Sequence, residues 1–517
     1  MIKQAGVVLA GAAIAAIGIY ADDAQAQEDA VVWARDGDID SLDPHRATST
    51  LSRMTWYQIY DSLLEFDLQG NLVPALAKDW NVSEDGRQIT FTLNEGILCH
   101  DGAPFTSADV VYTVERALSD DNPSLTKASW GPIEQVEAID DLTVRFNLAE
   151  PFSAFVPFMA DEFTSMLCLG NEAAGDAFGT SVAIGTGPWS FVSWEQGSEI
   201  VLASNPDYQN FGRPVENTGA PHMDLVIRTL PEGQTRLAGL NTGELDVIVP
   251  PVEAVPEILE NPDLKFLSVD VTGHNMFLEF SSARAPFDDV RARLAVAHAL
   301  DLDMALDIVF DGLVQRELCP VSSGIFGNDQ DFCAQYTPGY DPARSQELLE
   351  ELGFGEDNPL QMTLLTWTGD NRGRVLEVFQ NQLAQVGIQA GIEIMDIGTL
   401  NARVQQENLR DGGPGTMDLM GWTWFDPDIL YLLWHSPGAY QGYNTPELDA
   451  LLEETRTTSD PEARLAVVQE VMRHLLEEAV HVPVYSPGWL WMYATRADVE
   501  GFKLGAFDRP LFNDVQF

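Results

Sequence analysis

Basic residues are scarce in this sequence of 517 residues. Lysine and arginine together number 28 against 80 acidic residues, which leaves a formal charge of −52. A chain with this charge repels polyanions, so we expect no nucleic acid and no anionic lipid surface among its partners. The acids are spread along the whole chain rather than gathered in blocks, which indicates solubility in salty surroundings rather than a patch that collects cations.

Long apolar runs are also scarce, with one exception at the N-terminus. Lys3 precedes an apolar run over residues 5–19, and the small-x-small cleavage signal Ala24-Gln25-Ala26 follows it. The run is shorter than the ~20 residues of a membrane-spanning helix. We therefore expect a signal peptide over residues 1–26, cleavage after Ala26, and a periplasmic mature chain. The first cysteine is Cys99, so no lipid anchor is expected at the new terminus.

The sequence has only four cysteines, an even number that predicts disulfides in an exported chain. Three pairings are formally possible. The short, loop-like separation of Cys319 and Cys333 favours that pair, which leaves Cys99 with Cys168. Zinc is the competing reading, but there is no C-x-x-C and no histidine at ligand spacing. We expect no metal and no cofactor.

Hydrolase motifs are missing as well. The sequence contains no G-x-S-x-G elbow, no H-E-x-x-H pair and no recognisable Cys-His nucleophile setting. Asp426 and Asp428 are the carboxylate pair that glycoside hydrolysis would need, but residues two apart on a loop need not face one substrate. We expect a protein that is not an enzyme, with a secreted hydrolase as the alternative of another class.

What is present indicates a chain with more than one α/β unit. At 45% hydrophobic content the chain exceeds what one core normally supports. The stretch 31–34, which runs into a Gly/Asp/Pro loop, predicts a first strand, and alternating apolar residues predict strands over 88–93, 360–364 and 392–394. Apolar residues at helical spacing predict helices that start after caps at Thr106, Asp288, Asp341 and Asp460, and a helix over 375–386. Strands that alternate with helices indicate α/β lobes.

The segment from Ala75 to Leu118 carries the most specific pattern in the chain. It contains W-x-x-S-x-D-G from Trp80, an alternating strand, the turn N-E-G and the run H-D-G-x-P-x-T-S-A-D-V before a helix. A second stretch, G-T-G-P-W from Gly185, leads to N-P-D-Y. In this order the motifs resemble extracytoplasmic solute-binding protein family 5, the peptide- and nickel-binding proteins of ABC importers. The resemblance covers almost the whole mature chain.

This resemblance implies a two-lobed periplasmic-binding-protein fold of type II, in the large cluster with an extra subdomain. Lobe I would comprise residues 27–273 plus 486–517, with the subdomain at about 60–184, and lobe II would comprise residues 274–485. The ligand would lie in the cleft between the lobes. The implied function is that of a substrate-binding component that captures a peptide or peptide-like solute and delivers it to an inner-membrane ABC permease with its ATPase. We expect a monomer.

The stretch from Gly421 to Asp428 is the first candidate for ligand contact. It places Trp422, Trp424, Phe425, Asp426 and Asp428 in one loop, where aromatic faces can stack on a ligand and a carboxylate can receive an amine. A buried core corner is the structural alternative, and Trp422 suits it best. Family position favours ligand contact.

Two family anchors differ here. Peptide-binding relatives carry an amine-binding aspartate where this sequence has Phe425, so Asp426 is the candidate replacement. Trp367 and Thr368 lie where a dipeptide binder offers an arginine to the ligand carboxylate, and Arg374 is the candidate to reach instead. The changes leave a modified peptide, or an oligosaccharide that stacks on Trp424 and Trp367, as alternatives.

Two further residues complete the candidate set. His435 lies behind the aromatic loop, and because nickel-importing relatives use a histidine near a bound chelate, it supports a metal-chelate ligand as a third alternative. Asp38 follows the first strand in a loop rich in glycine, aspartate and proline. Such loops often face clefts, so Asp38 is also a candidate for ligand contact.

Overall fold

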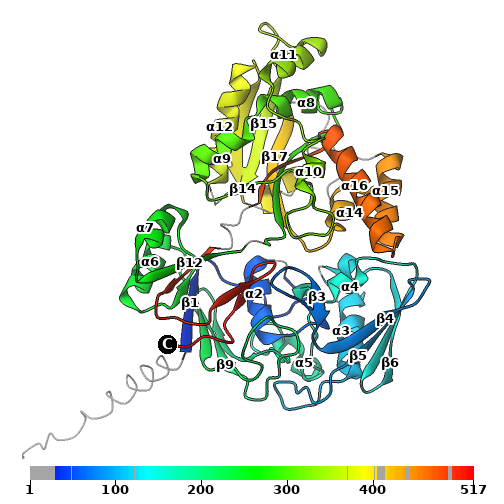
Figure 1. Ribbon diagram of the computed structural model, residues 1–517, viewed down its shortest axis with the longest axis vertical. Helices are drawn as coiled ribbons and strands as arrows, with labels where there is room; N and C mark the ends of the chain where they lie inside the picture. The colour runs from blue at the N-terminus through cyan, green and yellow to red at the C-terminus, as the bar shows by residue number, and fades with distance from the viewer. Residues whose placement is uncertain are drawn as a thin grey trace, which may run out of the picture.

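The structure, a computed structural model, consists of two lobes stacked one above the other (Figure 1). It describes residues 30–517 apart from 48, 121–123, 125, 270, 369–370, 397, 401, 405–413, 437–441, 444 and 487–491. The predicted signal peptide, residues 1–26, lies outside the described residues. Lobe I is the part built on a seven-stranded sheet, and lobe II is the part built on a six-stranded sheet.

The sheet of lobe I has the strand order β12-β19-β11-β1-β10-β9-β8. Its strands are β1 (Ala30–Arg35), β8 (Trp189–Glu195), β9 (Glu199–Ser204), β10 (Asp224–Thr229), β11 (Val247–Ile248), β12 (Leu264–Ser268) and β19 (Met492–Arg496). The central strand β1 runs parallel to β10 and β11. Because successive side chains alternate between its faces, Val31 and Trp33 enter one core cluster, and Val32 and Ala34 enter another. Both faces of β1 are therefore covered.

A separate four-stranded sheet forms the right-hand part of lobe I in Figure 1, with the order β4-β5-β7-β6. These strands are β4 (Ala77–Val82), β5 (Gln88–Leu93), β6 (Ile133–Asp140) and β7 (Thr143–Leu148). Two hairpins pair β2 (Leu64–Phe66) with β3 (Leu72–Pro74) and β20 (Lys503–Gly505) with β21 (Arg509–Leu511). The helices here are α2 (Thr50–Ile59), α3 (Ser107–Leu118), α4 (Phe155–Phe158), α5 (Gly170–Ala174), α6 (Gly233–Thr242) and α7 (Val255–Glu260). Short 3-10 turns occupy Lys127–Trp130, Glu162–Thr164, Gly175–Ala177 and Val252–Ala254.

The sheet of lobe II has the order β14-β18-β13-β17-β15-β16. Its strands are β13 (His274–Phe280), β14 (Gln315–Arg316), β15 (Gln361–Trp367), β16 (Gln389–Met395), β17 (Gly415–Thr423) and β18 (His481–Ser486). Helices cover it, namely α8 (Val290–Ala299), α9 (Leu302–Phe310), α10 (Gln330–Cys333), α11 (Pro342–Glu351), α12 (Arg372–Gln385), α14 (Ile429–Trp434), α15 (Pro446–Thr457) and α16 (Pro461–Glu477). All seven residues of β13 are buried, as expected for a strand at the centre of a covered sheet.

The two lobes touch on the side where α15 and α16 lie above α4 (Figure 1). Phe425 of lobe II packs against Phe66, Phe158 and Phe507 of lobe I, at ring-centroid distances of 5.8, 4.9 and 6.4 Å. Close by, the Ser153 hydroxyl donates to the carbonyls of Arg456 and Thr458, at 2.8 and 2.6 Å. The lobes are therefore closed on each other by apolar and polar contacts together.

Several predicted elements are confirmed at the level of single residues. The capping box of Thr106 and Asp109 starts α3, and Asp341 and Asp460 cap α11 and α16, each with a proline at the first turn. The prediction for α8 is wrong by one position, because Asp289 rather than Asp288 accepts the capping bond from the Arg291 N–H.

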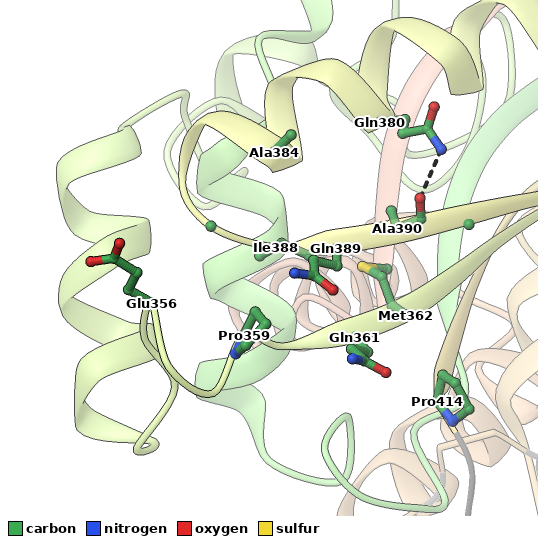
Figure 2. Close-up of a pocket in the computed structure, with 12 residues that line it drawn as sticks. Glu356, Pro359, Gln361, Met362, Gln380, Ala384, Ile388, Gln389, Ala390 and Pro414 are labelled. Atoms are coloured by element: carbon green, nitrogen blue, oxygen red, sulfur yellow. Dashed lines mark hydrogen bonds between the residues drawn. The ribbon is translucent and has the colours of Figure 1, made fainter.

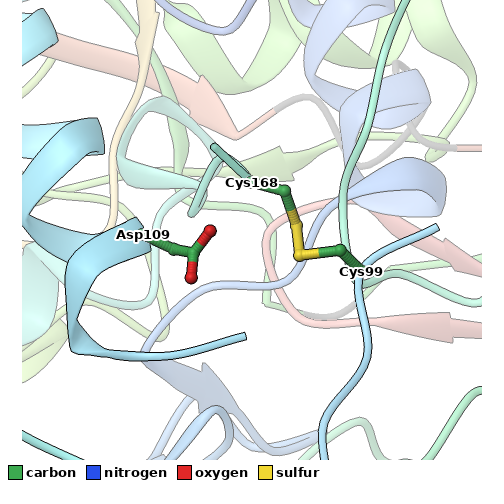
Figure 3. Close-up of side chains that lie close together, drawn as sticks. All are labelled: Cys99, Asp109 and Cys168. Atoms are coloured by element: carbon green, nitrogen blue, oxygen red, sulfur yellow. A yellow bond between two sulfur atoms is a disulfide. The ribbon is translucent and has the colours of Figure 1, made fainter. Parts of the chain in front are cut away.

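Both predicted disulfides are present, joining Cys99 to Cys168 and Cys319 to Cys333. The first brings the Asp109 carboxylate close to two sulfur atoms, as Figure 3 shows. Both sulfurs are committed to the disulfide, and Asp109 accepts bonds from the Thr106 and Leu169 N–H groups, at 2.8 and 2.9 Å. The closeness of Cys99, Asp109 and Cys168 is therefore explained by the fold around α3. Among the residues that the structure describes, no helix has the length and apolar character needed to cross a membrane.

Candidate functional site

A cavity of about 580 Å³ lies between the two lobes, and we call it the cleft cavity. Its volume is within the range of about 300–1,000 Å³ that is typical of small-molecule sites. Lobe I contributes Asp36, Thr50, Leu51, Met54, Arg236 and Val249 to Glu253, and lobe II contributes His274, Trp367, Asn371 and Arg372. A ligand here would contact both lobes at once.

Strand ends and one helix start position these residues. Asp36 follows β1, and Val249 to Glu253 follow β11, which runs parallel to β1. Trp367 ends β15, and Arg372 is the first residue of α12. Ligands of α/β proteins are commonly bound outside the carboxyl ends of parallel strands, and a helix N-terminus favours anions. The topology therefore brings three strand ends and one helix N-terminus to the same cavity.

Two arginines, one from each lobe, supply positive charge to the cleft cavity. The Arg372 guanidinium stacks on the Trp367 ring at 3.8 Å and donates to the Thr368 carbonyl at 2.9 Å. In lobe I, Arg236 donates to the Val249 carbonyl at 2.8 Å, and burial lowers the pKa of its guanidinium. Both side chains are held in fixed orientations by backbone carbonyls.

Among the described residues that line the cleft cavity, those with negative charge belong to lobe I. Asp36 and Glu253 line the cleft cavity, and both are exposed. The described part of the cavity wall therefore has two cations on separate lobes and two carboxylates on one lobe, an arrangement that suits a ligand with charges of both signs.

His274 is a neutral part of the wall. It begins β13, and its Nδ1 lies 2.6 Å from the Thr423 hydroxyl. Burial, together with the nearby Arg372, lowers the pKa of the imidazole to about 3. The ring therefore acts as a hydrogen-bonding group and adds no charge at neutral pH.

The loop that sequence analysis favoured is mostly buried between elements of the protein. Asp426 is 2% exposed and forms two hydrogen bonds with Arg464, at 2.9 and 2.6 Å. Asp428 receives Nε and Nη2 of Arg456, at 2.8 and 3.1 Å, while burial raises the pKa of this carboxyl to about 6. Both carboxylates are committed to arginines of lobe II.

The aromatic residues of that loop pack in a similar way. Phe425 fills the interlobe aromatic contact, and Trp424 stacks against it at 5.8 Å and meets Phe158 edge-on at 5.7 Å. Trp424 is 9% exposed. With the half-buried Trp422 it lines a cavity of only about 20 Å³ behind the cleft. Their rings therefore offer little free face to a sugar.

The other predicted residues are divided between the cleft and the outside. Trp367 lines the cleft cavity, and Thr368 lies beside it with an exposed side chain. Arg374 is exposed on α12 and is not among the residues that line the cavity. The arginine that lines the cavity is Arg372, two positions before the predicted Arg374. Spacing alone could not show which arginine is the first helical residue.

Asp38 and His435 have partners away from the cleft cavity. The Asp38 carboxylate accepts from the Gly197 N–H at 2.7 Å and the Trp194 indole at 3.0 Å, so it holds the hairpin of β8 and β9. His435 stacks on Tyr431 at 4.2 Å, and its Nε2 lies 3.0 Å from Glu453. Neither residue lines the cleft cavity.

A larger cavity of about 730 Å³ lies at the outer end of lobe II (Figure 2). It is lined by side chains such as Gln361, Gln380 and Gln389, next to the starts of β15 and β16. The charged residue among its lining is Glu356. The described lining residues all belong to one lobe, so binding here would not be coupled to lobe closure.

Comparisons with known proteins give a consistent result. A family model described as bacterial extracellular solute-binding proteins, family 5, middle, matches residues 71–444. The glutathione-binding protein GsiB of Pectobacterium atrosepticum is 29% identical, over 84% of this chain and 84% of its own length. GsiB of Escherichia coli K12 is 28% identical over 93% of each. The structure of DppA from Helicobacter pylori with the peptide STSA aligns with a TM-score of 0.76 at 25% identity, and covers 96% of this chain and 99% of that one.

Proposed function

Because this chain belongs to the bacterial extracellular solute-binding proteins of family 5, we propose that it captures a short peptide with charged termini for an ABC importer. The relatives named above are reported as binding glutathione or a peptide, and the family consists of binding proteins rather than enzymes. The expected partner is an inner-membrane permease with its ATPase. We propose a monomeric, periplasmic protein whose signal peptide is removed after Ala26.

The distribution of charge in the cleft cavity carries this proposal. A short peptide has an ammonium and at least one carboxylate, and glutathione has two carboxylates. Arg372 at the start of α12 and Arg236 in lobe I are placed for carboxylates, whereas Asp36 and Glu253 add negative charge. Charged hydrogen bonds of arginine to carboxylates are stronger and more directional than neutral ones.

The contacts of the aromatic residues favour a peptide over the two other solutes. An oligosaccharide needs open aromatic faces, but one face of Trp367 is covered by Arg372, and Trp424 is packed between Phe158 and Phe425. A metal chelate would use His435, which is stacked on Tyr431 and lies against Glu453. A peptide uses the arginines that the cleft does present.

We further propose that the lobes hinge where the chain passes between the two sheets, near residues 274 and 486. β12 belongs to the sheet of lobe I and β13 to that of lobe II, and β18 and β19 repeat the change in the opposite direction. A ligand that contacts both lobes favours the closed arrangement, because only that arrangement makes both sets of contacts.

Thermal unfolding and calorimetry of the mature chain test the function. The ligands are glutathione, the dipeptide Met-Leu, maltotriose and a nickel–histidine complex. At ~100 times its dissociation constant a ligand adds roughly 2.7 kcal/mol to stability, which raises the midpoint visibly. We expect a rise with the peptides alone and no hydrolysis of them. A rise only with maltotriose or nickel–histidine would contradict the peptide assignment.

A further inference from the structure

We propose that Asp508, in the turn between β20 and β21, binds the primary ammonium group of the ligand. The inference rests on the proposed peptide function and specifies which residue replaces the missing aspartate of the lobe II loop. The hairpin lies beside α2 beneath lobe II (Figure 1). It places a carboxylate from the end of the chain at the junction of the two lobes.

A small cavity adjoins Asp508 and is continuous in its lining with the cleft cavity. Its volume is about 10 Å³, close to the room that one water-sized group needs. Thr50 and Met54 of α2 line both cavities. The other residues around the small cavity are Arg53, Tyr57, Glu162, Thr423, Phe507, Asp508 and Arg509. A peptide backbone in the cleft cavity therefore has a neighbouring space that matches a terminal ammonium.

The Asp508 carboxylate is buried, with one oxygen still available. The side chain belongs to a residue that is 4% exposed. Its Oδ1 accepts from the Tyr493 hydroxyl at 3.3 Å, whereas Oδ2 has no hydrogen-bond partner among the residues that the structure describes. A buried oxygen without a hydrogen-bond partner destabilises the protein, and an ammonium that donates to Oδ2 would remove this cost.

The surrounding charges leave room for one more cation. Arg53 pairs with Asp161 and Glu162, and Arg509 pairs with Glu162 and Glu65. Two guanidinium groups thus face three carboxylates, with Asp508 as a fourth acid. An additional ammonium offsets the charge that Asp508 gains when it ionises, whereas a carboxylate of the ligand would be repelled.

The backbone at this turn is held in an uncommon conformation. Phe507 and Asp508 both have positive φ, at 56° and 63°, although neither is glycine. Non-glycine residues adopt this region at an energetic cost, and such residues gather at binding sites. The Phe507 N–H donates to the Val271 carbonyl at 2.9 Å, and its ring packs on Phe66 at 4.7 Å. These contacts fix the turn with Asp508 facing the small cavity.

Lobe II completes the small cavity through Thr423 at the end of β17. Its hydroxyl already faces His274 Nδ1 at 2.6 Å, and a hydroxyl can accept a further hydrogen bond. An ammonium between Asp508 and Thr423 would bridge the lobes. Amine recognition is thereby linked to closure.

Burial raises the pKa of the Asp508 carboxyl well above its usual range, which favours its protonated form in the empty site. An arriving ammonium stabilises the carboxylate, and the carboxyl proton leaves to solvent. Binding of a peptide with a free amine should therefore release more protons than binding of an N-acetylated peptide.

Calorimetry with glutathione and Met-Leu, each free and N-acetylated, tests the assignment in wild type, Asp508→Asn and Asp36→Asn. Wild type should prefer the free amine by roughly 30-fold or more, the usual effect of removing one partner of a buried charge pair. Asp508→Asn should reduce that preference to within about threefold and leave affinity for the N-acetylated forms unchanged. Asp36→Asn removes the competing carboxylate of the cleft cavity; it should change the affinity for the free and the N-acetylated forms by the same factor and so keep the preference.

Two results would overturn the inference, namely a preference that survives in Asp508→Asn and one that disappears in Asp36→Asn. If wild type binds no peptide in either form, it is the proposed function that fails. Thr423→Val provides a second variant on the opposite lobe and should lower the preference severalfold. If Asp508→Asn does not fold, the test is the number of protons that the wild type releases on binding, measured by calorimetry in buffers of different ionisation enthalpy. Equal numbers for free and N-acetylated peptides overturn the inference.

Discussion

The loop at Gly421–Asp428 and the start of α12 both belong to lobe II, and both combine tryptophan with charged residues. In the loop, Asp426 and Asp428 are paired with Arg464 and Arg456. At the start of α12, Arg372 and Trp367 line the cleft cavity. The same residue types thus stabilise the lobe in one place and form the cleft wall in the other. Which role a charged residue has depends on partners that are distant in sequence.

The largest expected effect is a loss of folding stability in Asp426→Ala. Removing one partner of a buried ion pair leaves the Arg464 charge uncompensated, which typically costs about 3–5 kcal/mol of unfolding free energy. Urea unfolding measures this loss, with the exposed Asp357→Ala as the control that should change stability by less than ~0.5 kcal/mol. Peptide affinity of the folded protein should stay the same. A variant of normal stability and lost affinity would assign the loop to the ligand site.

An intermediate effect is expected from His481, which lies behind the loop and stacks on Phe277 at 3.8 Å. Burial lowers the pKa of this imidazole to about 3. Below the unfolded-state pKa of about 6.5 the unfolded chain binds a proton that the folded chain refuses, so stability falls as the pH falls. Wild type should lose about 2 kcal/mol more than His481→Phe between pH 7 and pH 5.

Urea unfolding of both proteins at the two pH values gives this difference directly. The neighbouring Glu279 and Asp418 titrate with the opposite sign, because burial raises the pKa of both carboxyls, and their effect cancels in the comparison of the two proteins. An equal loss in both proteins would show that His481 is not a buried neutral group. Affinity for peptide should be the same in the two proteins at pH 7.

The smallest expected effect is a loss of peptide affinity from a change at the start of α12. Arg372→Lys keeps the charge but loses the planar fork and the stacking on Trp367, so we expect about a tenfold weaker affinity for Met-Leu, near 1.4 kcal/mol. Arg374→Ala, two residues further along the helix and exposed, should leave affinity unchanged. Calorimetry on the two variants separates them. A loss in Arg374→Ala alone would restore the assignment made from sequence.

Local structure was predictable from the sequence where a pattern and a cap coincide. Thr106, Asp341 and Asp460 mark helix starts correctly, the resemblance to the solute-binding family predicted the two-lobed α/β fold, and the even number of cysteines predicted the two disulfides. The lobe boundaries stay a prediction, which the strand membership of the two sheets supports. Caps act within four residues, so they can be read from a short window of sequence.

The candidate site was less predictable, because its determinants are contacts over long separations. Asp426 meets Arg464, 38 positions away, and nothing in the loop itself indicates that pairing. Asp508 lines the small cavity beside the cleft cavity from a C-terminal hairpin with no motif around it. Trp367 was found because it lies next to a position that the family resemblance marks. The set of predicted ligand residues therefore remains a prediction, with Arg372 and Asp508 as its main additions.

The hydrogen bonds from Ser153 to the carbonyls of Arg456 and Thr458 hold the lobes together at a distance from the cleft cavity. Contacts of this kind set the fraction of empty receptors that are already closed. Apparent affinity scales with the fraction of binding-competent molecules. While the open form predominates, each 1.4 kcal/mol added to or taken from such contacts therefore changes the apparent affinity about tenfold. Mutations at these interlobe contacts can therefore change the ligand concentration range over which the receptor works, while the residues that contact the ligand stay the same.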